Sequence, residues 1–244
     1  MRRRAIGLMY RFALSRRNVR VIFQNKDDRD LISDLAGVRP EQVRMIQGSG
    51  VDLERLEPAP LPQWRFCTVL AARLLIDKGV REFVEAARLL RERGLDARFA
   101  LAGDPDPHNP ACIPAGEIEV WRREGLIELP GQVSDIGALF AQAHAVVLPS
   151  YREGMPLVLL EAAACGRAVV TTDVPGCRNA IELGVTGLLA PVREAAGLAD
   201  SITLARDPAK CAEMGRQARQ LAERAFSIED VLARHLEIYA EPTL

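Results

Sequence analysis

From residue 66 to residue 225, short and continuously apolar runs alternate with longer amphipathic stretches. Short apolar runs are typical of strands in a parallel sheet that is covered on both faces, and the amphipathic stretches are typical of the covering helices. The predicted strands are 66–71, 97–102, 127–129, 145–148, 168–171 and 187–190, and the predicted helices are 80–93, 117–124, 136–143, 156–165, 179–182, 195–204 and 208–225. The pattern predicts a doubly wound α/β fold, which binds ligands at the carboxyl ends of its strands.

A proline-rich stretch at 57–63 separates this region from the beginning of the chain. Proline lacks a backbone donor, so three prolines in seven residues favour a linker. Before it, apolar runs at 19–24 and 43–46 flank a charged, helix-like stretch at 27–36, which predicts strand, helix and strand. We expect an N-terminal α/β remnant at 1–56, a linker at 57–63, a ligand-binding domain at 64–226, and a C-terminal helix at 227–244 that packs back on the N-terminal part.

Overall composition indicates an ordinary soluble globular protein. The formal net charge is −1, with 48% hydrophobic and 27% charged residues, so nothing in the bulk charge favours nucleic acid as a partner. The first twenty positions are an exception, because they contain seven arginines and no acidic residue: Arg2, Arg3, Arg4, Arg11, Arg16, Arg17 and Arg20. These arginines would attract an anionic lipid surface, or they are a solvated helix face.

Two further observations concern the cellular compartment. The five cysteines are widely spaced and form no Cys-x-x-Cys pair, which predicts neither a disulfide framework nor a zinc site and favours a reducing cytoplasm. No stretch approaches the roughly 20 apolar residues that cross a bilayer. We therefore expect a cytoplasmic protein, with peripheral contact at the inner face of the membrane left open.

The stretch after the apolar run 145–148 carries the strongest functional signal. Glu153 and Gly154 lie in a predicted turn, and Pro156 then opens a helix at the position where proline fits best. The free amides of Leu157 and Val158, with the positive end of the helix dipole, suit a phosphate group. Because glycine has no side chain, a ligand can approach the backbone at Gly154 closely.

Two carboxylates accompany this predicted phosphate site. Glu153 precedes the helix and Glu161 lies about a turn and a half inside it, so we expect both to face one crevice and to bind sugar hydroxyls. The alternative is that Glu153 is a helix cap and Glu161 a solvated surface residue. However, Glu161 interrupts the apolar run 157–164, and a buried carboxylate needs hydrogen-bonding partners.

Two cations follow the first strand of the predicted domain. Arg73 and Lys78 would lie at the same sheet edge as Glu153, where they can neutralise a diphosphate and stabilise the charge that develops as it leaves. By itself, an arginine followed five residues later by a lysine is a weak signal.

Together, these motifs resemble glycosyltransferase family 4. The resemblance covers nearly the whole chain, and the motifs are specific as a set rather than singly. It rests on Arg73 and Lys78, the Glu153/Glu161 pair, Gly103, Val174-Pro175-Gly176, Gly184 and Gly187. Three stretches in particular are similar to bacterial enzymes that build O-antigen, capsule and lipid-linked oligosaccharides: Phe23-Gln24-Asn25, Gly48-Ser49-Gly50-Val51-Asp52 and Pro149-Ser150-Tyr151-Arg152-Glu153-Gly154.

This resemblance implies the GT-B fold and a retaining transfer of a sugar from a nucleotide diphosphate, usually a UDP-sugar. The acceptor would be a glycan or a lipid-linked molecule in cell-surface polysaccharide biosynthesis, and the reaction would need no essential metal or other cofactor. The resemblance further implies that Arg73 and Lys78 hold the diphosphate, that Glu153 binds the donor sugar and Glu161 the ribose, and that Glu153, Arg73 and Lys78 serve catalysis. Backbone groups would contact sugar and phosphate at Gly154, Met155, Pro156, Leu157 and Val158, and the base would lie against Gln132 and Val133.

The Asp104-Pro105-Asp106 stretch superficially matches the metal-binding Asp-x-Asp of the other large glycosyltransferase fold. We expect no metal there, because the stretch lies in a proline-rich loop and the other motifs resemble GT-B enzymes.

The chain departs from the family at its beginning. Intact members start with a complete acceptor-binding α/β domain, whereas residues 1–56 resemble only the end of one. We therefore expect the chain to be inactive alone, or to need a partner that supplies the rest. Two alternatives stay open: a non-catalytic nucleotide-sugar-binding module or subunit, and a GT-B-type nucleotide-sugar epimerase, to which the Glu153/Glu161 element is a poor fit.

Overall fold

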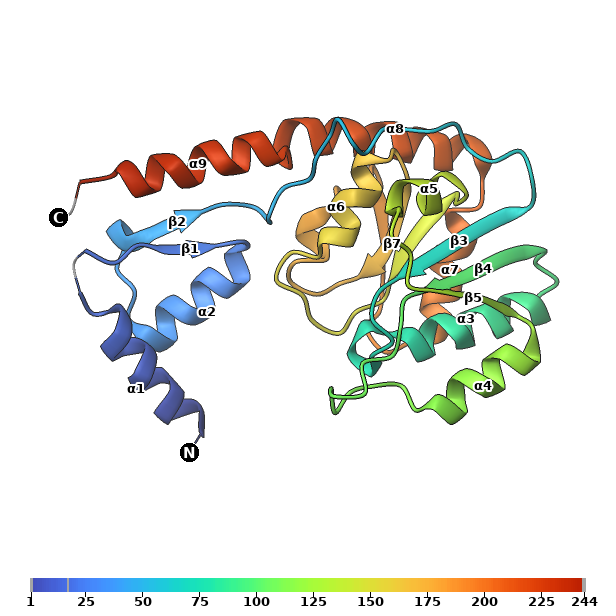
Figure 1. Cartoon of the computed structure of the whole chain (residues 1–244), viewed down its shortest axis with the longest axis horizontal. Helices are drawn as coiled ribbons and strands as arrows, with labels where there is room; N and C mark the ends of the chain where they lie inside the picture. The colour runs from blue at the N-terminus through green and yellow to red at the C-terminus, as the bar shows by residue number, and fades with distance from the viewer. Residues whose placement is uncertain (1, 17, 243–244) are drawn as a thin grey trace.

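The computed structural model describes residues 2–16 and 18–242, except for the side chains of residues 2–5. It contains two parallel sheets in this part of the chain (Figure 1). One is a sheet of two strands near the N-terminus, and the other has six strands in the order β5-β4-β3-β6-β7-β8. Arg17 and the side chains of Arg2, Arg3 and Arg4 lie outside the described residues, so the membrane contact expected of this arginine-rich segment stays a prediction.

The six-stranded sheet confirms the fold class predicted from the alternating pattern. Every pair of neighbouring strands is parallel. The strands are β3 (Phe66–Ala71), β4 (Ala97–Ala102), β5 (Ile127–Gly131), β6 (Ala145–Leu148), β7 (Ala168–Thr172) and β8 (Gly187–Ala190). Each begins where the apolar runs predict.

Helices cover both faces of this sheet (Figure 1). One buried cluster includes residues of α3 (Val80–Glu92), α4 (Ala115–Glu124) and α7 (Ala195–Leu204). The cluster on the opposite face includes residues of α5 (Ile136–Ala141), α6 (Leu157–Ala164) and the second half of α8 (Pro208–Ala225). The six-stranded part is therefore a three-layer α/β/α structure.

Helix ends differ slightly from the prediction near the candidate site. Helix α6 begins at Leu157, and Pro156 occupies the cap position before it instead of the first helical position. The predicted helix at 179–182 is a single 3₁₀ turn, Arg178–Ala180. Gly176 precedes that turn with a positive φ of 78°, a conformation that glycine adopts at little cost.

The N-terminal part contains α1 (Arg2–Leu14), β1 (Val21–Phe23), α2 (Lys26–Ala36), a 3₁₀ turn (Pro40–Gln42) and β2 (Val43–Met45). Its order of helix, strand, helix and strand agrees with the sequence pattern. Strands β1 and β2 form the two-stranded parallel sheet. Helix α9 (Ile228–Ala240) runs alongside this sheet in Figure 1.

Ion pairs hold the end of α9 to the N-terminal strands, and buried apolar residues join the N-terminal part to the six-stranded part. Glu241, just after α9, pairs with Arg20 at 2.7 Å and with Arg44 at 2.5 Å. Val51 and Leu56 lie before the predicted linker, yet both pack in the core of the six-stranded part. The domain boundaries at 57 and 63 stay a prediction.

Exposed apolar side chains gather on two helices of this part. Helix α1 exposes Leu8, Met9 and Phe12, and α9 exposes Leu236 and Tyr239. Strands β1 and β2 are half-buried, so the exposed large apolar side chains of this part lie on its helices instead. Among the described residues, no helix is both long enough and apolar enough to span a bilayer.

Candidate functional site

The strand order marks one place in the sheet where a ligand can enter. From β3 the chain adds β4 and then β5 on one side, and β6, β7 and β8 then extend the sheet on the other side. Adjacent loops after β3 and β6 therefore lead to opposite faces, which leaves a crevice at the carboxyl ends of these strands. Arg73 and Lys78 follow β3, whereas Glu153 and helix α6 follow β6.

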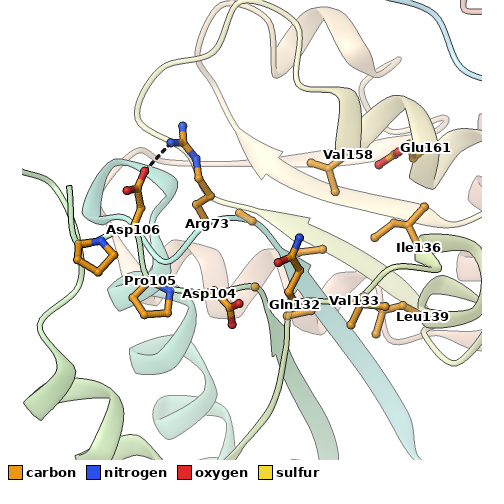
Figure 2. Close-up of a pocket in the computed structure, with 15 residues that line it drawn as sticks. Arg73, Asp104, Pro105, Asp106, Gln132, Val133, Ile136, Leu139, Val158 and Glu161 are labelled. Atoms are coloured by element: carbon orange, nitrogen blue, oxygen red, sulfur yellow. Dashed lines mark hydrogen bonds and ion pairs between the residues drawn. The ribbon is translucent and has the colours of Figure 1, made fainter. Parts of the chain in front are cut away.

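A pocket of about 480 Å³ lies at this edge (Figure 2). Its charged end contains Arg73 and Asp106, and its other end is mainly apolar, with Val158 and Glu161 of α6 facing the loop after β5. The lining residues are Ala71, Ala72, Arg73, Ala102, Gly103, Asp104, Pro105, Asp106, Pro107, Gln132, Val133, Ile136, Leu139, Val158 and Glu161. The structure thus brings together Arg73, Gln132, Val133, Val158 and Glu161 from the predicted site.

Glu161 is the most informative residue in this pocket. No hydrogen bond or ion pair to its carboxylate is found within residues 2–16 and 18–242. Burial raises the pKa of Glu161, and the positive charge of Arg55 offsets part of this effect. A half-buried carboxylate that lines a pocket without a protein partner is suited to accept hydrogen bonds from the hydroxyl groups of a ligand.

Glu153 lies outside the lining of the pocket and has protein partners. Lys78 Nζ donates to Glu153 Oε1 at 2.5 Å, and Ser150 Oγ donates to the same oxygen at 2.6 Å. No hydrogen bond to Glu153 Oε2 is found in the described part of the chain. The structure therefore holds Glu153 in place through one oxygen and leaves the other without a partner among the described residues.

Arg73 and Lys78 lie at the same edge of the sheet but have different partners. Arg73 Nη1 donates to Asp106 Oδ2 at 2.9 Å, and its side chain is 62% exposed (Figure 2). Lys78 instead contacts Glu153. The bond to Asp106 uses one nitrogen of the exposed Arg73 guanidinium, so its other N–H groups can still donate to a ligand.

The beginning of α6 supplies unpaired backbone donors beside Glu153. Among the described residues, no acceptor is found for the N–H groups of Met155, Leu157 and Val158. The side chains of Met155 and Pro156 are buried, so these two residues can contribute to a ligand site mainly through their backbone. Free amides and the positive dipole end of an eight-residue helix suit an anion, as the sequence predicts.

Sequence reasoning missed one set of contacts that holds the loop after β6. Tyr151 donates a 2.6 Å hydrogen bond to Glu82 of α3, and the Arg193 guanidinium lies 4.5 Å from its ring centroid. Burial, followed by the nearby Glu82 carboxylate, raises the pKa of Tyr151 to about 12. Only Tyr151 belongs to a recognisable motif, and no spacing in the sequence connects it with Glu82 or Arg193.

The structure also bears on the Asp104-Pro105-Asp106 stretch. Both aspartates line the pocket, but Asp106 is engaged by Arg73. Within the described residues, no three histidine, cysteine, aspartate or glutamate side chains are grouped so that they could hold a metal ion.

Comparison with known proteins shows where this fold occurs. The crystal structure of Alr3699/HepE from Anabaena in complex with UDP superposes with a TM-score of 0.83 at 24% identity, over 96% of this chain and 68% of that one. The fold is thus that of GT-B glycosyltransferases.

Sequence relatives extend the comparison. An N,N'-diacetylbacillosaminyl-diphospho-undecaprenol alpha-1,3-N-acetylgalactosaminyltransferase from Campylobacter jejuni is 30% identical over 233 residues, which are 89% of this chain and 59% of the relative. A D-inositol 3-phosphate glycosyltransferase from Arthrobacter is 36% identical over 207 residues, 78% of this chain and 48% of the relative. The chain therefore spans about half the length of these curated relatives.

The family model described as "Glycosyl transferases group 1" matches residues 66–206, which include the six-stranded sheet and the whole pocket. This match covers more than half of the chain, and the Campylobacter relative supports it along most of the remainder. The chain belongs to the family of group 1 glycosyl transferases.

Proposed function

We propose that this chain contains the donor-binding domain of a retaining glycosyltransferase that moves a sugar from a nucleotide diphosphate, most often UDP, to a glycan or lipid-linked acceptor. The observation that carries the proposal is the pocket at the switch point between β3 and β6. It combines a carboxylate, Glu161, with a cation, Arg73, and lies beside the amides at the start of α6, and neither the carboxylate nor these amides have a partner in the described part of the chain. Carboxylate, cation and free amides match the ribose and diphosphate of a sugar nucleotide.

In this proposal each part of the donor has its own partners. The base lies against Gln132 and Val133, and Glu161 accepts hydrogen bonds from the ribose hydroxyls. Arg73, Lys78 and the backbone of residues 154–158 hold the diphosphate, and Oε2 of Glu153 accepts a hydrogen bond from the sugar. Because Lys78 already contacts Glu153, it can link the phosphate and sugar subsites.

The relatives support the class of substrate. The Anabaena structure was determined with UDP bound, and the name of the Campylobacter enzyme describes transfer to a diphospho-undecaprenol lipid. For this chain, the lipid-linked acceptor is a proposal that rests on the second name. Cell-surface polysaccharide biosynthesis and work at the inner face of the membrane are proposals that rest on the sequence resemblance and on the arginine-rich N-terminal segment.

A second candidate is a nucleotide-sugar-binding module that needs a partner for turnover. The observation that favours it is the exposed apolar surface of α1 and α9 around the small N-terminal sheet, which a partner would cover. On this view, residues 1–56 and the C-terminal helix at 227–244 are the part of an acceptor domain that a partner completes, joined by the linker at 57–63 to the donor domain at 64–226.

Calorimetric titration of the purified chain with UDP and several UDP-sugars, first without and then with divalent metal, tests the main proposal. We expect metal-independent binding. A donor-hydrolysis assay on the same material then separates an active enzyme from a binding module. Absence of UDP binding under both conditions would refute the proposal.

Two substitutions test the residue assignments. Lys78→Ala should weaken UDP binding by about 1.5–3 kcal/mol, the range for a charged hydrogen bond. Glu153→Gln keeps the shape of the side chain and should reduce discrimination among UDP-sugars while sparing UDP itself. Lys210→Ala, an exposed lysine on α8, is the matched control and should leave both unchanged. Wild-type affinities in both site variants would show that the site has been assigned wrongly.

A further inference from the structure

Asn25 is a buried polar residue that connects the N-terminal part to the loop before α6. It is 2% exposed and lies at the cap position of α2. Its Oδ1 accepts a hydrogen bond from the Asp28 N–H at 2.7 Å, and its Nδ2 donates to Asp28 Oδ2 at 2.8 Å. The same Nδ2 donates to the Gly154 carbonyl at 2.7 Å, across 129 positions of sequence.

Capping of α2 does not explain the bond to Gly154. A cap needs only an acceptor, and serine, threonine or aspartate at position 25 would supply one. Asparagine differs from these residues because its amide also donates two hydrogen bonds. The use of one of them on Gly154 gives Asn25 a role beyond α2.

Other close contacts hold Gly154 in one position. A Cβ added to Gly176 would lie 2.4 Å from the Gly154 carbonyl oxygen, so these two backbones touch. From the N-terminal part, Gln24 Oε1 would be 3.3 Å from a Cβ on Gly154, and a Cβ on Gly48 would be 2.9 Å from Met155 Cγ. The loop is thus packed between the N-terminal part and the segment after β7.

The geometry of the peptide bond connects this packing with ligand binding. In a planar trans peptide, the C=O and the following N–H point in opposite directions. Because the Gly154 carbonyl points at Asn25, the N–H of Met155 points away from it, and this N–H has no acceptor among the described residues. Asn25 therefore fixes the direction of the first free amide in the row Met155, Leu157 and Val158.

We propose that Asn25 is a positioning residue that aims the Met155 N–H, the first of these amides, at the phosphate of the bound nucleotide, and so couples the N-terminal part to donor binding. This inference rests on the proposed function, because it needs a phosphate at the start of α6. Donor affinity then depends on how the two parts of the molecule sit against each other.

Asn25→Ser is the variant that separates the two roles. Serine keeps an acceptor for the Asp28 N–H but is too short to donate to Gly154. We expect UDP affinity to fall by about two- to tenfold, the ratio that corresponds to one lost hydrogen bond. Affinity for uridine, which has no phosphate, should not change.

Two further variants complete the test. Each variant is titrated with UDP and with uridine by calorimetry, at a temperature where it is folded. Asn25→Asp keeps the cap and places an acceptor against the Gly154 carbonyl, so the loss of UDP affinity should exceed that of Asn25→Ser. Asp207→Ala removes the remote cap of α8, whose Oδ1 accepts from the Lys210 N–H, and should lower the melting temperature without changing UDP affinity.

The outcomes distinguish this inference from the proposed function. Wild-type UDP affinity in Asn25→Ser, or equal losses for UDP and uridine, would overturn the positioning role while the donor site stands. No binding of UDP by the wild-type chain would overturn both. A loss for UDP alone, graded from serine to aspartate, supports the role of Asn25.

Discussion

Glu161, a carboxylate with no hydrogen-bonding partner among residues 2–16 and 18–242, faces a pocket whose other lining residues at that end are mainly apolar. Such a group lowers the stability of the empty protein, because its charged form has lost water without gaining a partner. The presence of the Glu161 carboxylate in this pocket is consistent with a ligand that supplies the missing hydrogen bonds. The same residue thus connects stability with the proposed recognition of ribose.

Glu161→Gln should stabilise the empty protein and weaken donor binding. The pKa of Glu161 is raised by burial, so as the pH rises past about 4.3 the unfolded chain releases this proton before the folded one, and the free energy of unfolding falls. Glutamine removes this loss. We expect a higher melting temperature than wild type at pH 7, a difference that disappears below about pH 4, and weaker UDP binding at pH 7.

Thermal denaturation between pH 3.5 and pH 8, with calorimetry at pH 7, measures both effects. Glu213→Gln, an exposed glutamate on α8, is a control that should not affect UDP binding. A melting temperature that falls at pH 7 in Glu161→Gln would mean that the carboxylate has a stabilising partner.

At the scale of single residues, the sequence was informative where a motif is continuous and much less so where partners are distant. Glu153 and Glu161 were predicted from one stretch of chain, since a polar residue in an apolar helix stands out. Their surroundings were not predicted. Glu153 accepts hydrogen bonds from Lys78 and Ser150, whereas no such donor to Glu161 is found among the described residues. Pairs such as Tyr151 with Glu82 depend on tertiary packing, which no spacing encodes.

At the scale of elements, the loop after β3 is held by a backbone contact at Gly79. Its φ is 70°, and a Cβ there would lie 2.1 Å from the carbonyl oxygen of Pro149, just after β6. This contact brings the loops after β3 and β6 together and so places Lys78 near Glu153.

Gly79→Ala should be far more damaging than Gly94→Ala. Both glycines have a positive φ, which costs alanine about 1–2 kcal/mol, but a Cβ at Gly94 would meet nothing within 4 Å. We expect Gly94→Ala to cost about that amount, and Gly79→Ala to exceed about 3 kcal/mol and to weaken UDP binding in any folded fraction. Urea denaturation measures the free energy of unfolding of both variants. Equal losses would show that the loops after β3 and β6 can move apart at little cost.

The elements themselves were well predicted from sequence because parallel strands here are continuously apolar and therefore conspicuous. All six strands of the large sheet lie where expected. The predictions were wrong mainly at the ends of helices. Pro156 lies at the cap position before α6, and the predicted helix at 179–182 is a 3₁₀ turn at Arg178–Ala180. Local hydrogen bonds decide such ends, and apolar periodicity does not report them.

At the scale of the whole molecule, the exposed apolar side chains of α1 and α9 are the largest departure from an ordinary surface. Leu8, Met9 and Phe12 are 67%, 73% and 85% exposed, and Leu236 and Tyr239 are 66% and 73% exposed. Apolar residues gathered in this way favour association.

We therefore expect the chain to self-associate at micromolar concentration. Phe12→Glu combined with Leu8→Glu should shift the population towards monomer, because each places a charge in the contact. Sedimentation velocity measures the shift. Leu204→Glu, at an apolar position on α7 that is 58% exposed, is the control that should leave association unchanged. A wild-type chain that sediments as a single monomer at all concentrations would contradict the expectation.

The chain passes between its two parts twice, once after β2 and once between α8 and α9, and the passages are bonded to each other. The Val51 N–H donates to the Phe226 carbonyl at 2.8 Å, and the Ile228 N–H donates to the Val51 carbonyl at 3.0 Å. Two chain segments that are hydrogen-bonded side by side resist sliding and twisting relative to each other, but the pair can still bend. We infer that the two parts move relative to each other mainly by a swing about one axis, which runs through Val51 and Ser227.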